Sequence, residues 1–193
     1  MKRTTAKAKE VTHERIVEAA ARAIRRSGYD GASVNEIMSD VGLTHGGFYA
    51  HFVSREAMLA EAADRAGADS IANSTRVAST ALPGQSLQRM LRAYLSKEHV
   101  RNAENGCPVA ALGSEMPRQA PAVRHAATRR IKEMIDVVAR QSPDWGQAGA
   151  HERALATVST MVGALLVARA VDDPKLCDAV LRAALQHLTP AGV

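Results

Sequence analysis

Several side chains that could contact a nucleic acid lie close together between Ser33 and Arg55. A hydroxyl at a helix N-terminus can bind a phosphate, and a histidine can hydrogen-bond the edge of a base. Two adjacent glycines would let the backbone approach a groove closely; inside an ordinary short helix each would cost ~1 kcal/mol. A tyrosine, a second histidine and an arginine could reach phosphates. The candidate DNA-contacting residues are Ser33, Thr44, His45, Gly46, Gly47, Tyr49, His51 and Arg55.

Two short helices, one on each side of Gly42, must position these side chains. Ser33 and Glu36 have the spacing of a capping box, which predicts that the first helix begins there. Thr44 is the expected cap of the second helix, and Ser54 is that of the next one. Glycine at the turn permits the tight crossing of a helix-turn-helix, whose second helix enters the major groove of DNA. The apolar residues expected to hold the pair against a preceding helix are Val34, Ile37, Met38, Val41, Phe48 and Phe52.

The preceding helix is expected to begin at Thr12 and to end at Gly28, a typical left-handed C-terminal residue. Residues 1–11 are polar and basic and predict a flexible arm. Residues 1–26 contain eight Lys or Arg and three Glu, an excess equal to the net charge of +5 of the whole chain. Such an arm suits contact with phosphates, although a solvated tail that aids solubility has the same composition.

Helical periodicity continues through the rest of the chain, with an interruption at Pro83 and Gly84. Alanine is abundant and β-branched residues rarely run together, which favours helix over strand. We therefore predict an all-α protein of about nine helices. They are expected at about 12–28, 34–41, 44–52, 54–78, 85–102, a short one from Pro108, 122–141, 146–171 and 174–188. The expected organisation is a basic arm over 1–11, a DNA-binding domain over 12–62 and a ligand-binding and dimerisation domain over 63–193.

The N-terminal third of the chain resembles the DNA-binding domain of the TetR family of transcriptional regulators. The matching segments are Arg15–Ala20, Gly28–Ile37, Val41–Phe52 and Ser54–Leu59. The block from Gly42 to Phe52, followed by Ser-Arg-Glu-x-x-Leu, is the most specific part of the match. Arg55 stands where the family more often has lysine, which keeps the charge, and Met38 stands where many members have alanine, a difference in packing.

The resemblance implies a three-helix DNA-binding head, a connecting fourth helix and a helical ligand-binding and dimerisation domain. It also implies a homodimer that represses transcription from a palindromic operator in double-stranded DNA and is released by a small-molecule effector, whose identity the sequence leaves open. In the expected mechanism the effector tilts the fourth helix and changes the separation of the two heads. A dimer is also favoured because one short recognition helix reads few base pairs, whereas two half-sites multiply specificity.

The resemblance places a ligand pocket among the helices that follow Pro83. Methionines suit an adaptable site, although each of these residues could equally be ordinary core. Residues around Cys107 resemble a branch of the family in which a cysteine senses electrophiles or oxidants, and a thiol near a helix N-terminus can be reactive. A small buried apolar residue is the other interpretation of Cys107. The candidate pocket residues are Met90, Tyr94, Cys107, Met116, Met134, Val138 and Trp145.

The two C-terminal helices combine small and large apolar residues, which allows helices to approach closely. Paired across a two-fold axis they could form a four-helix dimer interface; an ordinary core within one chain is the alternative. The candidate interface residues are Leu155, Val158, Val162, Leu165, Leu166, Leu181 and Leu185.

Other classes of protein find little support in the sequence. It lacks a nucleophile elbow, a glycine-rich phosphate loop and an evident Cys/His pair, and its histidines lack metal-ligand spacing, so we expect no enzyme activity, metal or cofactor. A non-specific architectural DNA binder is disfavoured because residues 27–193 sum to zero net charge. The apolar run Ala154–Ala168 is short and reads as a buried or interface helix, and no secretory segment follows the basic N-terminus, so we expect a cytoplasmic protein without a membrane partner.

Overall fold

The computed structural model describes residues 2–189, with side chains described from Lys7 onward. Over these residues the chain forms nine α-helices and three short 3-10 turns, without strands, which confirms the all-α prediction. The elements are α1 (Lys2–Gly31), α2 (Val34–Asp40), η1 (His45–Ala50), α3 (Arg55–Ser79), α4 (Ser86–Tyr94), α5 (Lys97–Arg101), η2 (Ala103–Asn105), α6 (Pro108–Leu112), η3 (Met116–Arg118), α7 (Pro121–Gln141), α8 (Ala150–Ala170) and α9 (Pro174–Leu188).

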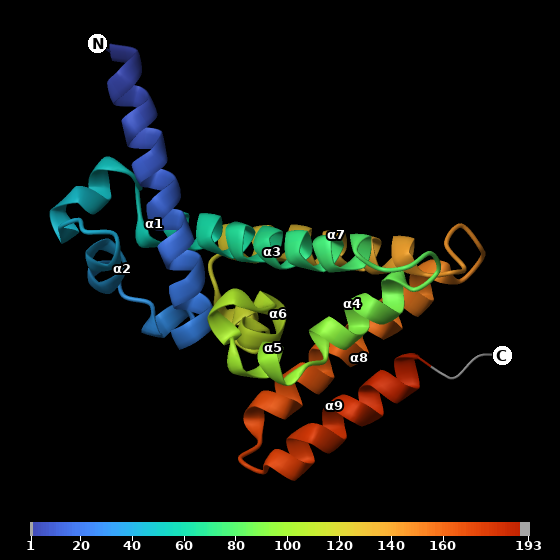
Figure 1. Ribbon diagram of the computed structural model, residues 1–193. Helices are drawn as coiled ribbons and strands as arrows, with labels where there is room; N and C mark the ends of the chain where they lie inside the picture. Colours follow the sequence, from blue (N-terminus) through green and yellow to red (C-terminus); the bar gives the residue numbers. More distant parts are fainter. Residues whose placement is uncertain (1, 190–193) are drawn as a thin grey trace.

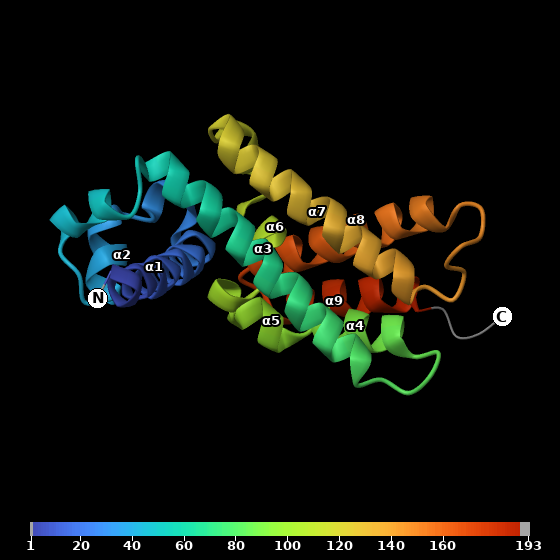
Figure 2. The same ribbon diagram turned by 90° about the horizontal axis from the view of Figure 1, so that it is seen from above.

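The helices form a small head and a larger second part that share α3. In the head, α1 packs against α2 and against the beginning of α3 (Figure 1). Helix α3 then leaves the head and lies alongside α7, while α8 and α9 pair on the other side of the second part (Figures 1 and 2). One continuous helix therefore connects the two parts.

Helix α1 begins earlier than predicted. It is helical from Lys2, so the expected flexible arm is wrong for the described residues, and Thr12 is no cap but donates from Oγ1 to the Ala8 carbonyl at 2.9 Å. Residues 2–27 contain neither glycine nor proline and are rich in Ala, Lys, Arg and Glu, so nothing stops the helix from extending. The first turns project beyond the rest of the head (Figure 1). Gly28, the predicted end, has φ +79° and interrupts the helix with a kink, and the last turn of α1 up to Gly31 follows that kink.

The prediction of a single helix over residues 85–102 is also wrong, because α4 ends at Tyr94 and a separate helix, α5, begins at Lys97. Ser96 starts a new helix, its Oγ accepting from the His99 N–H at 3.2 Å. The His99 ring then donates from Nδ1 to the Tyr94 carbonyl at 2.8 Å, which satisfies a carbonyl left free where α4 ends. Ser96 thus caps the start of α5, and His99 hydrogen-bonds the end of α4.

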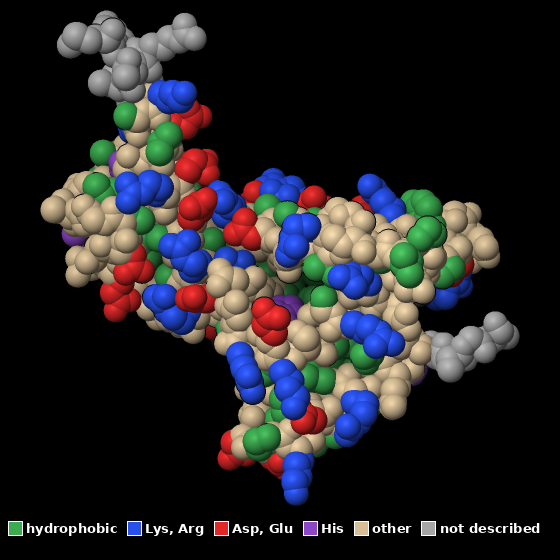
Figure 3. Space-filling model, in the orientation of Figure 1, with side chains coloured by type: hydrophobic (Ala, Val, Ile, Leu, Met, Phe, Trp, Pro, Cys, Tyr) green, Lys and Arg blue, Asp and Glu red, His purple; other side chains and the backbone are tan. Residues whose placement is uncertain are grey.

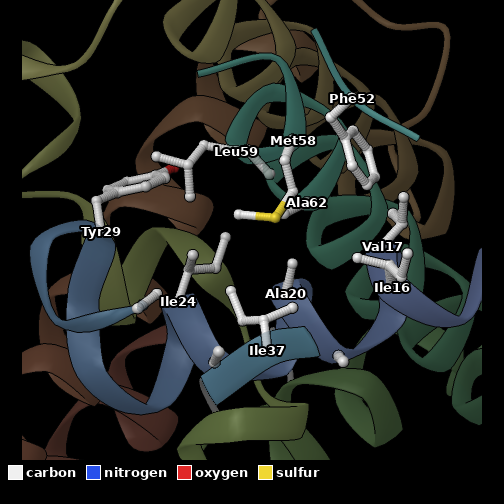
Figure 4. Packing of buried hydrophobic residues seen from close by; sticks show 14 of the residues in the cluster. Ile16, Val17, Ala20, Ile24, Tyr29, Ile37, Phe52, Met58, Leu59 and Ala62 are labelled. Atoms are coloured by element: carbon white, nitrogen blue, oxygen red, sulfur yellow. The ribbon is translucent and has the colours of Figure 1, made fainter. Parts of the chain in front are cut away.

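The head has one apolar core, to which α3 contributes a full face. Figure 4 shows Met58, Leu59 and Ala62 of α3 packed against Ile16 and Ile24 of α1, and all five are almost fully buried. Burying each large side chain stabilises the fold by about 1.5–3 kcal/mol. Three residues from beyond α3 join the same cluster, namely Leu112, Val123 and Ala126. The division expected between residues 62 and 63 therefore falls inside a continuous helix and a shared core.

A second core fills the space between α4, α7, α8 and α9. Ala154, Val158, Met161 and Leu165 form the inward face of α8. By length and composition alone, α8 is apolar enough to cross a membrane. Its contacts with α7 and α9 give a structural reason for that apolar character.

We predict that Gly67→Ala destabilises the protein. A Cβ there would lie 2.5 Å from Cβ and Cγ of Arg130, whose guanidinium is fixed by Asp64 and Glu133. Overpacking of this kind costs about 1–3 kcal/mol, whereas helix propensity alone would make alanine better by about 1 kcal/mol. Urea unfolding measures the difference. The exposed Ala72→Gly change on the same helix measures the propensity contribution, and a Gly67→Ala protein stabilised by that amount would contradict the close packing.

Candidate DNA interface and ligand cavity

The predicted helix-turn-helix is formed by α2 and η1. Gly42 turns the chain with φ +74°, and the Leu43 N–H bonds the Met38 carbonyl at 2.8 Å. Phe48 and Phe52 anchor η1, with their rings stacked at a centroid distance of 5.3 Å and almost fully buried. The second element is thus held by one aromatic face, and its other face is left to solvent.

That outer face carries most of the predicted DNA contacts. Thr44, His45 and Gly46 are exposed, and Tyr49 is 71% exposed. The Thr44 side chain makes no capping hydrogen bond, so its hydroxyl is available to a phosphate. A Cβ at Gly46 would meet nothing within 4 Å, so the fold does not require glycine there. The second glycine of the pair, Gly47, is half-buried, and a Cβ added there would lie 3.6 Å from the Met38 side chain.

The structure gives Ser33, His51 and Arg55 different surroundings. Ser33 caps α2 as predicted, its Oγ accepting from the Glu36 N–H at 3.1 Å. The Arg55 Nη2 donates to the Tyr29 carbonyl and, at 3.2 Å, to the Ala32 carbonyl, so part of the guanidinium is used inside the head instead of being free for a phosphate. These bonds tie the end of α1 to α3.

His51 is half-buried and better suited to hydrogen bonding than to charge pairing. Burial and the neighbouring His13 and Lys9 lower the pKa of His51, which keeps its ring neutral near pH 7. His13, which the sequence did not single out, stacks on Phe52 at 4.5 Å, and its Nε2 lies 2.6 Å from Glu61 Oε2. It therefore supports the recognition element from α1, a role that depends on contacts with Phe52 and Glu61, which are distant in sequence.

A cavity of about 300 Å³ opens between α3, α4, α5 and η2. Figure 3 shows the surface hollowed in this region, between α3 and the helices below it. Met90, Tyr94 and Cys107 of the predicted pocket line it. Its remaining lining is more polar than expected and includes Ser70, Asn73, Ser74, Ser96, Glu98, His99, Asn102 and Asn105.

Two much smaller cavities adjoin the main one, and Ser70 borders all three. Met116 and Met134 line a cavity of about 20 Å³ that also reaches Cys107. Val138 and Met134 line one of about 10 Å³ behind Tyr94. Trp145 belongs to none of them; it is 54% exposed between α7 and α8, so its placement near the pocket is corrected.

A chain of hydrogen bonds fixes the floor of the main cavity. The Cys107 N–H donates to His99 Nε2 at 2.9 Å, while His99 Nδ1 donates to the Tyr94 carbonyl. Both ring nitrogens are therefore used in one neutral tautomer. Burial lowers the pKa of His99 to about 4, in agreement with that tautomer.

Two arginines from distant parts of the chain hold the same segment. Arg25 of α1 is 5% exposed and donates from Nη1 to the Gly106 carbonyl at 3.3 Å. Arg169 of α8 donates from Nη2 to the His99 carbonyl at 2.7 Å. A Cβ at Gly106 would lie 2.7 Å from His99 Nε2 and 2.8 Å from Arg169 Nη2, so only glycine fits between them. No pattern in the sequence indicates this cluster, because its members come from three distant helices, α1, α5 and α8.

Family comparisons agree with this geometry. Residues 16–62 match the model described as bacterial regulatory proteins, tetR family, and residues 83–183 match that of the LmrA/YxaF-like transcriptional regulator C-terminal domain. The chain belongs to the TetR family. It is a DNA-binding transcriptional regulator, as the resemblance implied.

The TetR-family relatives cover nearly the whole chain. The uncharacterised HTH-type transcriptional regulator Rv0196 of Mycobacterium tuberculosis is 30% identical over 182 residues, which cover 88% of this chain and 90% of the relative. Two solved structures share the fold. A TetR regulator from Chloroflexus aurantiacus has a TM-score of 0.76, with 23% identity over 95% of this chain and 97% of its own. Reduced NemR of E. coli has a TM-score of 0.73, with 19% identity over 92% and 95%.

The predicted dimer residues of this TetR-family chain fall on two faces. Val158, Leu165 and Leu181 are buried in the chain's own second core, so their prediction as contacts to another copy is corrected. Val162 and Leu185 are half-buried against that core. Leu155 and Leu166 are each 41% exposed, and two residues that were not predicted, Val167 of α8 and Leu176 of α9, are exposed as well. Helical periodicity could not separate these faces because α8 is apolar on both.

We predict opposite consequences for Tyr49→Ala and Arg55→Gln. Tyr49→Ala should weaken binding to a duplex selected from random double-stranded DNA by about 10- to 100-fold and leave the melting temperature unchanged, because the ring is exposed. Arg55→Gln should lower stability by about 1–3 kcal/mol, because two carbonyls lose their donor, and should change DNA affinity little. Fluorescence anisotropy and thermal melting measure the two effects. The reverse pattern would mean that Arg55, rather than Tyr49, faces DNA.

We also predict that His99 makes folding sensitive to acid. Because the folded pKa of His99 is about 4, the unfolded chain takes up a proton at this residue below about pH 6.5 that the folded chain does not. Its contribution to stability is thus complete above pH 6.5 and falls as the pH drops, by up to about 3 kcal/mol at pH 4. Urea unfolding of wild type and His99→Gln at several pH values isolates the effect. Equal slopes with pH in the two proteins would contradict it.

Proposed function

We propose that this TetR-family regulator is a non-catalytic, homodimeric cytoplasmic repressor that binds a palindromic operator and is released by a small molecule bound in the 300 Å³ cavity. The continuity of α3 carries the proposal. Met58 and Leu59 of this helix lie in the core of the DNA-binding head, and Ser70, Ser74 and Val77 of the same helix line the cavity.

The cavity has a second connection to the head through α1. The Arg25 side chain bonds the Gly106 carbonyl in the cavity wall, and the Tyr29 N–H donates to Glu115 Oε2 at 2.8 Å. A ligand that moves the 106–115 segment therefore pulls on the end of α1 as well as on α3. Two recognition elements must match half-sites about 34–36 Å apart or a multiple of this, so a small change in their separation lowers affinity.

The outer face of α8 and α9 supports a homodimer. Both helices expose apolar side chains, namely Leu155, Leu166 and Val167 of α8 and Leu176 of α9. Gly163 of α8 has open space where a side chain would be, which allows another helix to approach closely. Helix pairs of this composition bury such faces against a symmetric copy. Contact with a second copy of the chain also accounts for the apolar outer face of α8, so that face need not contact a membrane.

The thiol-sensing alternative concerns the same cavity. Cys107 is unpaired and 1% exposed, and it lines the main cavity, so only a reagent that fits the cavity reaches the sulfur. Cys107→Ser separates the two mechanisms. A variant that still leaves DNA when effector is added identifies non-covalent binding as the signal, whereas a variant that stays on DNA supports the thiol mechanism.

One experiment tests the dimeric operator complex. Leu166→Glu should give a monomer by light scattering and weaken binding to the selected duplex by at least about 100-fold, because the two heads no longer bind together. Leu82→Glu, at an exposed leucine outside α8 and α9, is the matched control and should leave both properties unchanged. A Leu166→Glu protein that remains dimeric would refute this interface, and selection of non-palindromic duplexes by wild type would refute the symmetric operator.

A further inference from the structure

The wall of the main cavity contains a buried hydroxyl without a strong hydrogen-bond partner. Tyr94 is 5% exposed and lines the cavity, and its Oη has no nitrogen or oxygen partner among the described residues; its neighbour is the Cys107 thiol, a weak acceptor. Buried tyrosine hydroxyls ordinarily bond a partner, because leaving the group unbonded costs stability. A hydroxyl held in this way at the base of a cavity is suited to anchor a ligand that carries a hydrogen-bond acceptor.

A positive charge lies in the wall of the same cavity. Arg169 Nη2 would be 2.8 Å from a Cβ at Gly106, which lines the cavity, and its Nε and Nη1 are buried without a hydrogen-bond partner among the described residues. Its one hydrogen bond goes to a neutral acceptor, the His99 carbonyl, and none of the ion pairs among the described residues includes Arg169. A buried guanidinium without an anion is unfavourable, so a negative group bound nearby would compensate it.

The other groups around the cavity leave this positive charge uncancelled. The His99 ring is neutral, with both nitrogens engaged. Arg76 and Glu98 line the exposed rim as one positive and one negative charge, and their effects offset. The remaining lining consists mainly of hydroxyl and amide side chains with a few apolar ones, among them Met90 and Val77.

We propose that the effector is a small organic anion, a carboxylate or phenolate, whose charged oxygen accepts a hydrogen bond from Tyr94 Oη and is attracted by Arg169. This inference rests on the proposed function, because it names the chemical class that the same cavity binds. A cavity of about 300 Å³ is at the lower end of the usual range for ligand sites, so it suits a compact molecule such as a one-ring acid.

Three probes of almost equal size and different charge test the proposal on the full-length protein. Benzoate, benzamide and benzylamine are titrated at neutral pH by calorimetry. We expect benzoate to bind most tightly, benzamide about ten-fold more weakly and benzylamine least, as for one charge-assisted hydrogen bond. Equal or tighter binding of benzylamine, or no saturable benzoate binding up to about 10 mM, would overturn the anionic assignment.

Matched variants locate the binding group. Tyr94→Phe should weaken benzoate binding by about ten-fold. Tyr29→Phe is the control, because Tyr29 also has a buried hydroxyl without a described partner but lines only the cavity of about 20 Å³, so benzoate binding should be unchanged. Equal losses in the two variants, or none in Tyr94→Phe, would show that Tyr94 is not the anchor.

The charge contribution needs its own comparison. Arg169→Gln keeps a donor for the His99 carbonyl but removes the charge, so it should weaken benzoate by about ten-fold and leave benzamide unchanged. Equal loss for both probes would indicate distortion of the cavity and contradict the electrostatic role.

Selection of duplex DNA by the unliganded protein distinguishes failure of the proposed function from failure of the proposed effector class. Benzoate binding without DNA binding refutes the repressor, and DNA binding without benzoate binding refutes the ligand class.

Discussion

The structure depends on one helix being shared by two apolar cores. Helix α3 is 25 residues long, about 37 Å at the rise of an α-helix, and it has no break between Arg55 and Ser79. Its first turns pack in the head, its middle packs closely against α7 through Gly67 and Arg130, and its last turns line the main cavity. Because packed helices resist bending, movement at the cavity end reaches the head as tilt or translation of the whole helix.

The polar cluster around Gly106 is costly in stability, which suggests a use other than holding the fold. Arg25, His99 and Arg169 are largely or partly buried and spend their hydrogen bonds mostly on backbone carbonyls. Apolar side chains of similar volume would often stabilise such a site more. What the polar groups provide is defined positions: they connect α1, the cavity wall and the outer helix α8. Those are the three parts that the proposed ligand-controlled dimer must coordinate.

The recognition face differs from the Gly106 cluster, because few contacts support it and much of its surface is exposed. Phe48 and Phe52 carry most of the packing of η1, and His13 supports them from α1. Tyr49 adds one edge-to-face ring contact with Phe48 at 5.2 Å, but it is largely exposed to solvent, as is His45. Because stability and DNA contact use different residues, the DNA-facing side chains can vary without loss of the fold.

The sequence by itself determined the class of fold, the family and the recognition element. Local signals were sufficient for these: the cap at Ser33, the turn at Gly42, the end of α1 at Gly28 and the proline start of α6 depend on a few neighbouring residues. Only the tertiary structure decided which groups meet across long separations. In the folded chain Arg55 hydrogen-bonds the end of α1, and the helix that contains Tyr94 ends at that residue. Arg25 and Arg169 both hydrogen-bond the same cavity wall. The apolar residues of α8 are divided between an inner and an outer face. Helical periodicity shows that a side chain is apolar and which neighbours share its face, but what packs against that face depends on the other helices.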